Sequence, residues 1–138
     1  MTLQEPRVQR FLATKEVVVL ATIQHDGSPL ALPMWFLHDT STMTMISMEA
    51  TQKVRNLRRD ARVSVVVESG SRGDVRGVSV QGRAEFLSDS AERRALVARF
   101  LEKYQPNLER LWGGRAMPPN RVMFTIVPER VRCWGLDG

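Results

Sequence analysis

The chain has 138 residues, of which 43% are hydrophobic and 25% charged, and its formal net charge is +5 at pH 7. This length and balance are typical of one globular domain that buries its own core. No apolar run is long enough to span a bilayer, residues 1–10 are too polar for a secretory signal, and Cys133 has no second cysteine to pair with. We therefore expect one cytoplasmic domain over residues 1–138 without a membrane partner.

The first half of the chain alternates strand-like runs with turn signals. Apolar residues at helical spacing predict a helix over 3–14, and the Asp-Gly pair at 26–27 is typical of a hairpin. The strands expected in this half are 16–24, 29–37 and 42–48, with a second turn at 38–41. A basic helix that begins at Thr51 follows the third strand.

The second half continues this pattern and ends on strands. A helix is expected over 89–104, capped by Ser88 or Asp89, and a Gly/Pro-rich connection follows over 105–120. The expected strands are 62–68, 75–87, 121–127 and 130–134, the last two separated by Pro128-Glu129. Six or seven strands in so short a chain predict a mainly β fold, a small antiparallel barrel with helices outside it.

The strand expected over 29–37 is apolar on both of its faces. A strand that lines a barrel core needs only one apolar face, so something must cover the other. The cover could be a ligand, the chain's own helices or another subunit. We favour a two-fold dimer that buries this face.

The start of the basic helix suits an anion. A helix begins with unpaired backbone N–H groups at the positive end of its dipole. With Thr51 as N-cap and Lys53 and Arg55 close by, this place could hold a phosphate. The alternative is that the cations form an ordinary solvated face of an amphipathic helix.

The sequence lacks the residues that several classes of chemistry require. One cysteine and two histidines, His25 and His38, both at expected turns, cannot build a zinc site by the usual spacing. The sequence has no G-x-S-x-G elbow, P-loop or Rossmann glycine motif. A nucleic-acid-binding barrel would need aromatic residues among its cations, and strands 62–68 and 75–87 offer only Phe86. We therefore expect no nucleic-acid partner.

Six segments in order resemble the pyridoxamine 5′-phosphate oxidase-like split β-barrel superfamily, and most closely its flavin/deazaflavin oxidoreductase branch. The segments are 20–23 (LATI), 26–29 (DGSP), 33–36 (PMWF), 51–63 (TQKVRNLRRDARV), 80–84 (VQGRA) and 127–134 (VPERVRCW). The resemblance implies a split antiparallel β-barrel of six to seven strands. It also implies a homodimer whose cofactor sites lie at the subunit interface, with FMN or the deazaflavin coenzyme F420 as cofactor.

The resemblance also implies a set of cofactor-binding residues. The ring would lie along the strand that carries Leu32, Pro33, Met34, Trp35 and Phe36, and the phosphate would meet the start of the basic helix. The remaining implied contacts are Thr51, Gln52, Lys53, Arg55, Arg59, Gly77, Val78 and Trp134, the last as a lid over the partner subunit's cofactor.

The chain departs from the oxidases at three places. Gln52 stands where the oxidases carry an arginine, Gly77 and Val78 stand where they carry a glutamine, and their C-terminal substrate-binding motif has no clear counterpart. Pyridoxamine phosphate is therefore not the expected substrate.

The function implied is hydride transfer between reduced F420 and a small unsaturated substrate, with no catalytic side chain because the cofactor carries the chemistry. Cations beyond the phosphate, such as Arg58 and Arg62, favour the longer anionic tail of F420 over FMN. An FMN-dependent enzyme and a non-catalytic cofactor carrier are the alternatives.

Overall fold

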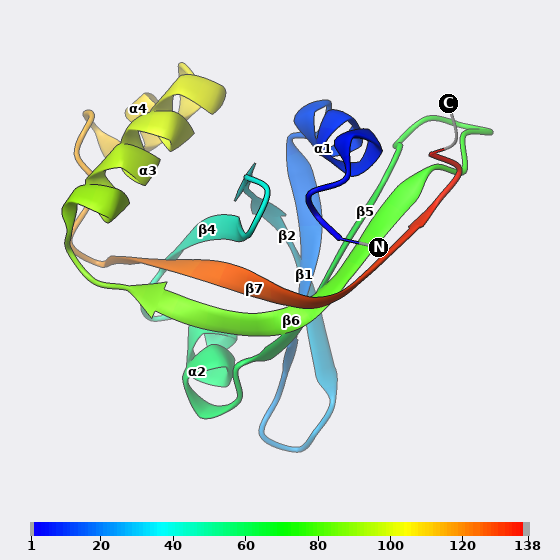
Figure 1. Ribbon diagram of the computed structural model, residues 1–138. Coiled ribbons are helices and arrows are strands. Elements are labelled where there is room, and N and C mark those ends of the chain that lie inside the picture. The colour runs from blue at the N-terminus through cyan, green and yellow to red at the C-terminus, as the bar shows by residue number, and fades with distance from the viewer. Residues whose placement is uncertain (1, 137–138) are drawn as a thin grey trace.

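The computed structural model describes residues 2–136. Within these residues, seven strands form one antiparallel sheet in the order β2-β1-β5-β6-β7-β4-β3. The strands are β1 (Val17–Ile23), β2 (Pro29–Trp35), β3 (Leu37–His38), β4 (Met43–Met48), β5 (Arg62–Glu68), β6 (Gly77–Leu87) and β7 (Arg121–Trp134). The sheet curls until β2 comes close to β4 (Figure 1). This confirms the mainly β, split-barrel fold expected from the sequence.

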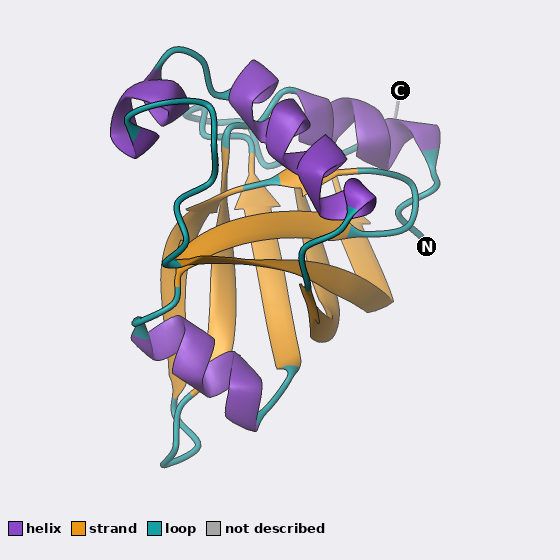
Figure 2. Cartoon of the chain, turned by 90° about the vertical axis from the view of Figure 1, so that its left-hand side faces the viewer, coloured by secondary structure: helices purple, strands orange, loops and turns teal. Residues whose placement is uncertain are grey.

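The helices lie outside the curled sheet. They are α1 (Pro6–Ala13), α2 (Gln52–Arg59), α3 (Ala91–Lys103) and α4 (Asn107–Trp112). Helices α1, α3 and α4 lie toward one end of the barrel, and α2 covers the opposite end (Figure 2). The predicted helix α2 is confirmed, with Val54 and Leu57 buried on its inner face.

Alternation along the strands builds the core. In β1, Val18 and Leu20 are about 1% exposed, whereas Val17 and Val19 are exposed on the opposite face. This period of two is the pattern of a strand with one buried face. A second apolar cluster lies under α3 and α4 and includes Leu37, Leu96, Phe100, Leu101, Tyr104, Leu108 and Met123. The α3–α4 pair is thus packed onto the barrel.

Tyr104 anchors that pair at the break between β2 and β3. Phe36 separates the two strands, and its N–H donates to the Tyr104 hydroxyl at 2.8 Å. The hydroxyl in turn lies 2.7 Å from the carbonyl of Glu16 and 3.0 Å from that of Phe36. Burial raises the pKa of Tyr104 to about 12, so the hydroxyl keeps its proton. Lys103 Nζ also donates to the Phe36 carbonyl, at 2.8 Å.

Two local expectations in the region of α3 and α4 were wrong. The N-cap of α3 is Ser90, whose hydroxyl accepts from the N–H of Arg93, instead of Ser88 or Asp89. The connection expected over 105–120 contains a helix, α4, which ends at Gly113 in the left-handed conformation. Leu108 of α4 is buried, and this tertiary packing stabilises a helix too short to form alone.

The two closing strands expected at the C-terminal end are one continuous strand. β7 runs through Pro128 and Glu129, and a bulge sets Gln81 opposite Arg130 but Gly82 opposite Pro128. A bulge tolerates a proline because one residue is left out of the hydrogen-bond ladder. A Cβ on Gly82 would stand 2.1 Å from the carbonyl oxygen of Val127, so only glycine fits opposite the bulge.

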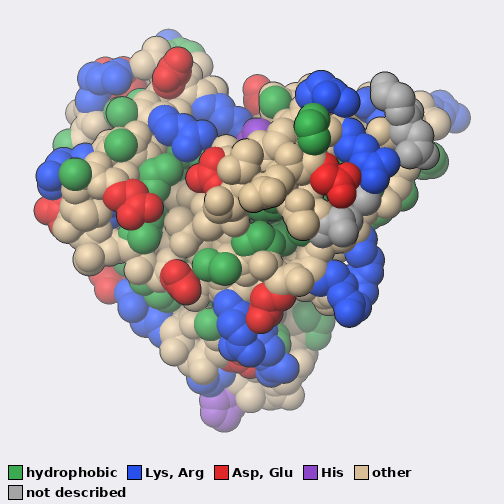
Figure 3. Space-filling view, viewed as in Figure 1, with side chains coloured by type: hydrophobic (Ala, Val, Ile, Leu, Met, Phe, Trp, Pro, Cys, Tyr) green, Lys and Arg blue, Asp and Glu red, His purple; other side chains and the backbone are tan. Residues whose placement is uncertain are grey.

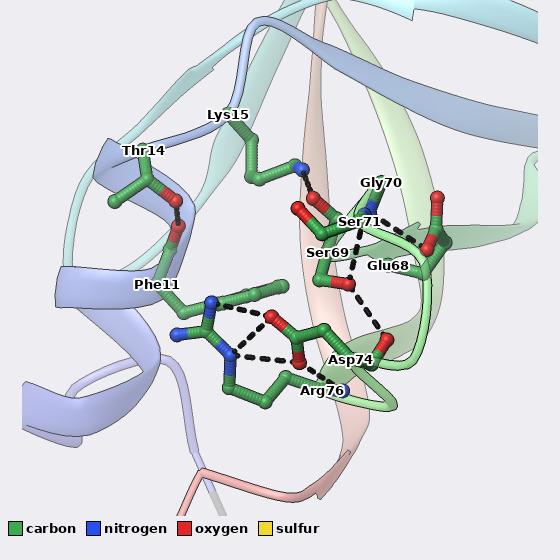
Figure 4. A network of polar contacts seen from close by, with 9 residues as sticks. All are labelled: Phe11, Thr14, Lys15, Glu68, Ser69, Gly70, Ser71, Asp74 and Arg76. Atoms are coloured by element: carbon green, nitrogen blue, oxygen red, sulfur yellow. Dashed lines mark hydrogen bonds and ion pairs between the residues drawn. The ribbon is translucent and has the colours of Figure 1, made fainter.

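The loop between β5 and β6 is tied to the end of α1 (Figure 4). Lys15 Nζ donates to the carbonyl of Ser69 at 2.5 Å, and Arg76 pairs with Asp74 at 2.8 Å. The hydrogen bonds from Arg76 lower the pKa of Asp74. The Arg76 guanidinium lies 5.5 Å from the centre of the Phe11 ring. These contacts fix the approach to Gly77, where β6 begins.

We expect Tyr104→Phe to lower the free energy of unfolding by about 1–3 kcal/mol, because it leaves the buried N–H of Phe36 without its acceptor. Urea unfolding followed by tryptophan fluorescence measures the change. The matched control is Phe86→Leu, a partly buried apolar position outside the α3–α4 cluster. A Tyr104→Phe variant as stable as the parent would contradict the anchoring role.

Candidate functional site

A cavity of about 410 Å³ lies where β2 and β4 approach each other, between the start of α2 and the α3–α4 pair. Its apolar walls consist of Pro33, Met34, Trp35, Ile46, Met48, Phe100, Leu108, Leu111 and Trp112. Its polar corner consists of Ser47, Thr51, Lys53 and Arg121. The cavity therefore combines a large apolar surface with one cationic end, as ligand sites commonly do.

Aromatic stacking holds the wall that β2 contributes. The Trp35 ring stacks on the Tyr104 ring with centroids 4.4 Å apart and an interplanar angle of 5°. Phe100, one turn earlier on α3, lies 6.2 Å from Tyr104. Because Tyr104 is itself hydrogen-bonded to the barrel, Trp35 is oriented before any ligand binds.

The polar corner is built around Lys53 at the first turn of α2. Lys53 Nζ donates to Ser47 Oγ at 3.0 Å, and within residues 2–136 it has no carboxylate partner. Desolvation by burial lowers the pKa of Lys53. An ammonium group held without a counter-charge beside a cavity is well suited to bind an anion.

Thr51 occupies the N-cap position of α2 but does not cap it through its side chain. Its backbone is extended, as an N-cap requires, yet its hydroxyl donates to the carbonyl of Met48 at 3.0 Å. The hydroxyl also lies 3.4 Å from Ser47 Oγ. The N-cap position expected from the sequence is therefore confirmed, and the N–H groups of the first turn of α2 have no side-chain acceptor from Thr51.

Arg121 is a residue of this corner that the sequence analysis did not include. It opens β7 and pairs in register with Met48 at the end of β4, so the β4–β7 pairing carries it to the start of α2. Its Nη1 donates to Asn120 Oδ1 at 2.6 Å. A position directly after a Pro-rich connection carries no signal in the sequence that would single it out.

The other polar residues expected from α2 do not line the cavity. Gln52 and Arg59 both donate to the buried Asn56, at 2.8 and 3.4 Å, and Arg59 also donates to the carbonyl of Ile23. Arg55 is exposed and donates to Gln52 at 3.0 Å. Asn56 in turn donates to Thr22 on β1 at 3.0 Å, so this side of α2 attaches the helix to the barrel.

The remaining expected residues divide into two groups. Leu32 and Phe36 belong to β2 and its end but do not line the cavity, and Phe36 is fully buried in the core. Gly77, Val78 and Trp134 lie together at the opposite end of the β6–β7 pair (Figure 1). A Cβ on Gly77 would stand 2.1 Å from the Trp134 ring, so the glycine makes room for the indole.

The cavity contains no carboxylate or imidazole for acid–base or metal chemistry. No Asp, Glu or His is among its lining residues. Among the residues that the structure describes, no cluster of three or more His, Cys, Asp or Glu side chains could hold a metal ion. No helix within residues 2–136 is long and apolar enough to cross a membrane. A bound cofactor would have to supply any redox chemistry at this site.

The curled sheet and the cavity at its split define a split-β-barrel protein. The chain belongs to the pyridoxamine 5′-phosphate oxidase family, whose N-terminal family model matches residues 4–135. This confirms the resemblance inferred from the six sequence segments. A comparison with curated proteins gives no match.

Three solved structures illustrate the relationship. A conserved hypothetical protein, Rv2991, from Mycobacterium tuberculosis is 29% identical, with a TM-score of 0.79 over 96% of this chain and 84% of that one. A putative pyridoxamine 5′-phosphate oxidase from Listeria innocua is 28% identical, with a TM-score of 0.74 over 93% and 95%. A FAD-binding protein from Mesorhizobium loti is 25% identical, with a TM-score of 0.71 over 91% and 87%.

We expect Lys53→Met to leave the protein at least as stable as the parent at neutral pH. The lowered pKa of Lys53 means that folding disfavours its charged form, and methionine keeps an apolar stem without the charge. Since the unfolded chain then binds the extra proton, the stability of the parent should rise relative to the variant as the pH approaches 10.5, the ordinary pKa of lysine.

Urea unfolding at a series of pH values measures this difference. Ser47→Ala is the matched control, because it removes the same hydrogen bond without removing the charge. A Lys53→Met variant less stable than the parent by more than about 1 kcal/mol would mean that the hydrogen bond to Ser47 is structural.

Proposed function

We propose that the protein is an F420-dependent oxidoreductase that transfers hydride between the reduced deazaflavin and a small unsaturated substrate. The observation that carries this proposal is the cavity beside β2, which joins apolar walls to a corner formed by Ser47, Thr51, Lys53 and Arg121. Membership of the pyridoxamine 5′-phosphate oxidase family supports it. So does the likeness to a FAD-binding protein at 25% identity.

The residues fit a flat ring that carries an anionic side chain. Trp35 and Trp112 offer aromatic surface to a ring system, and Lys53 and Arg121 offer two cations to a phosphate. When bound, the deazaflavin supplies the hydride chemistry. The chain's own part is to orient the ring along β2, to neutralise the phosphate charge and to exclude water with the α3–α4 pair.

Cations outside the cavity favour F420 over FMN. FMN ends at its phosphate, whereas F420 continues into an oligoglutamate tail that needs further positive charge. Arg55 and Arg58 are exposed on α2 and follow Lys53 along the helix. Arg58 makes a loose, exposed pair with Glu49, at 3.6 Å, and its guanidinium lies 4.3 Å from the centre of the Phe86 ring. Both contacts leave N–H donors that can meet a carboxylate. FMN remains the alternative cofactor.

A second candidate function is a cofactor carrier without a dedicated substrate. The observation that favours it is the absence of Asp, Glu and His from the cavity lining. Hydride transfer from a flavin-type cofactor does not require such a group, so this observation is compatible with both functions. Turnover measured with a panel of enones and quinones distinguishes them.

We also propose that two copies of the chain form a homodimer. Val17, Val19 and Val66 are 43%, 36% and 39% exposed, and Val19 pairs in register with Val66 across β1 and β5. Pro33, which lines the cavity, pairs with Val19 on the other side. An apolar strip that is continuous with the cavity is best explained by a second copy that covers it and adds Trp134, which is 40% exposed, to the site. Val78, which the resemblance also implied as a cofactor contact, is buried in the core of its own subunit.

We expect Lys53→Ala and Arg121→Gln each to weaken F420 binding about tenfold to a hundredfold, since a hydrogen bond to a charged group contributes about 1.5–3 kcal/mol. Quenching of tryptophan fluorescence during titration with F420, and separately with FMN, measures the affinity. Arg72→Gln, in the exposed loop before β6, is the matched control.

The outcomes of this titration separate the cofactors. Preferential binding of F420 that also depends on Arg55 and Arg58 supports the deazaflavin. FMN is supported if the Lys53 variant loses the same affinity for both cofactors and if substitution of Arg55 or Arg58 changes neither affinity. If neither Lys53→Ala nor Arg121→Gln changes the affinity, the cofactor phosphate does not bind at this corner.

For the dimer, we expect Val19→Glu to shift the protein from dimer to a 15.7 kDa monomer in sedimentation velocity, because it would bury a carboxylate in an apolar interface. Val75→Glu, at a loop position 74% exposed, should not change the mass. A parent protein that sediments as a monomer at micromolar concentration would rule out a shared site.

A further inference from the structure

A second cavity, of about 490 Å³, lies between α3 and the segment that follows α4. Its floor includes Val97, Leu101 and Met117, and its rim carries Arg93, Arg94 and Arg115. It shares no lining residue with the cavity beside β2. In the lobe that carries α3 and α4, at the upper left of Figure 3, hydrophobic side chains are interspersed with Lys and Arg.

The rim arginines have hydrogen-bonding capacity to spare. Arg94 pairs with Asp89 and Arg115 with Glu109, both at 3.3 Å, and all four side chains are at least 43% exposed. Arg93 donates to the carbonyl of Leu87, also at 3.3 Å. Such exposed pairs contribute little, and a guanidinium has five N–H donors, so each rim arginine can turn toward a ligand.

We propose that this cavity binds an amphipathic monocarboxylate, a molecule with an aliphatic or aromatic chain and one carboxylate group. The chain would lie on the floor formed by Val97, Leu101 and Met117, and the carboxylate would be held by Arg94 and Arg115. The planar guanidinium fork matches the two oxygens of a carboxylate. This site is independent of the cofactor proposed for the cavity beside β2.

The charges around the cavity favour a ligand with a single negative charge. Two of the three rim arginines pair with carboxylates, Arg94 with Asp89 and Arg115 with Glu109, so one positive charge is left in excess. The floor offers no hydrogen bond from its side chains to a fully polar anion, because Val97 and Met117 are partly exposed apolar residues and Leu101 is buried beneath them. A short apolar chain with one carboxylate satisfies both constraints.

The test uses octanoate and its neutral counterpart, 1-octanol, as probes in isothermal titration calorimetry of the full chain. We expect saturable binding of octanoate that is at least tenfold tighter than that of octanol. The double variant Arg94→Gln/Arg115→Gln should weaken octanoate at least tenfold and leave octanol unchanged. Both arginines are more than half exposed, so the variant is expected to fold.

Two further variants make the result specific. Val97→Glu places a carboxylate on the floor and should abolish octanoate binding, whereas Arg72→Gln, in the exposed loop before β6, should have no effect. Equal binding of octanoate and octanol, equal losses in Arg72→Gln and the double variant, or no saturable heat at millimolar octanoate would each overturn the proposal. Titration of the double variant with F420 and FMN shows whether the cofactor site beside β2 is unchanged when octanoate binding is weakened. The result for octanoate can therefore be judged separately from the proposed function.

Discussion

The structure depends on the break between β2 and β3 and on the side chain of Tyr104, which hydrogen-bonds to the backbone there. Phe36 lies between β2, which pairs with β1, and β3, which pairs with β4, and it is buried without a strand partner of its own. Tyr104 accepts the Phe36 N–H at 2.8 Å, and Lys103 donates to the Phe36 carbonyl. Because an unpaired buried backbone group is costly, the end of α3 is fixed at this point, and the position of α4 follows from it.

This anchoring also determines the wall of the candidate site. Trp35 precedes the break and stacks on the Tyr104 ring, so the same residue that repairs the backbone orients the indole. At the other end of the cavity, Lys53 is held without a carboxylate and its pKa is lowered by burial. Some exposed cations elsewhere form ion pairs, such as Arg76 with Asp74 and Arg62 with Asp60. Lys53 instead combines partial burial with a place on the wall of the cavity, and this combination suits the corner to an anion.

The order of the elements could be predicted from the sequence because each depends on a local signal. β-branched alternation marked β1 and β5, the Asp-Gly pair marked the first hairpin, and the spacing of Val54 and Leu57 marked α2. Apart from the N-cap of α3, which is displaced by one or two residues, the errors arose where distant residues decide the local structure. α4 forms because Leu108 is buried against the α3 cluster, and β7 continues through Pro128 because Gly82 leaves room for the bulge.

The candidate site was predictable to the extent that it lies on one continuous segment. Thr51 and Lys53 follow β4 directly, and Pro33, Met34 and Trp35 share one strand, so sequence order places each group. Arg121 reaches the site only because β4 and β7 pair in this register, and Trp112 only because α4 packs on the barrel. The local sequence predicts neither of these long-range contacts. Gly77 and Trp134 show the converse. They pack on each other at the far end of β6 and β7, so they can belong to a cofactor site only if a second copy of the chain brings them to it.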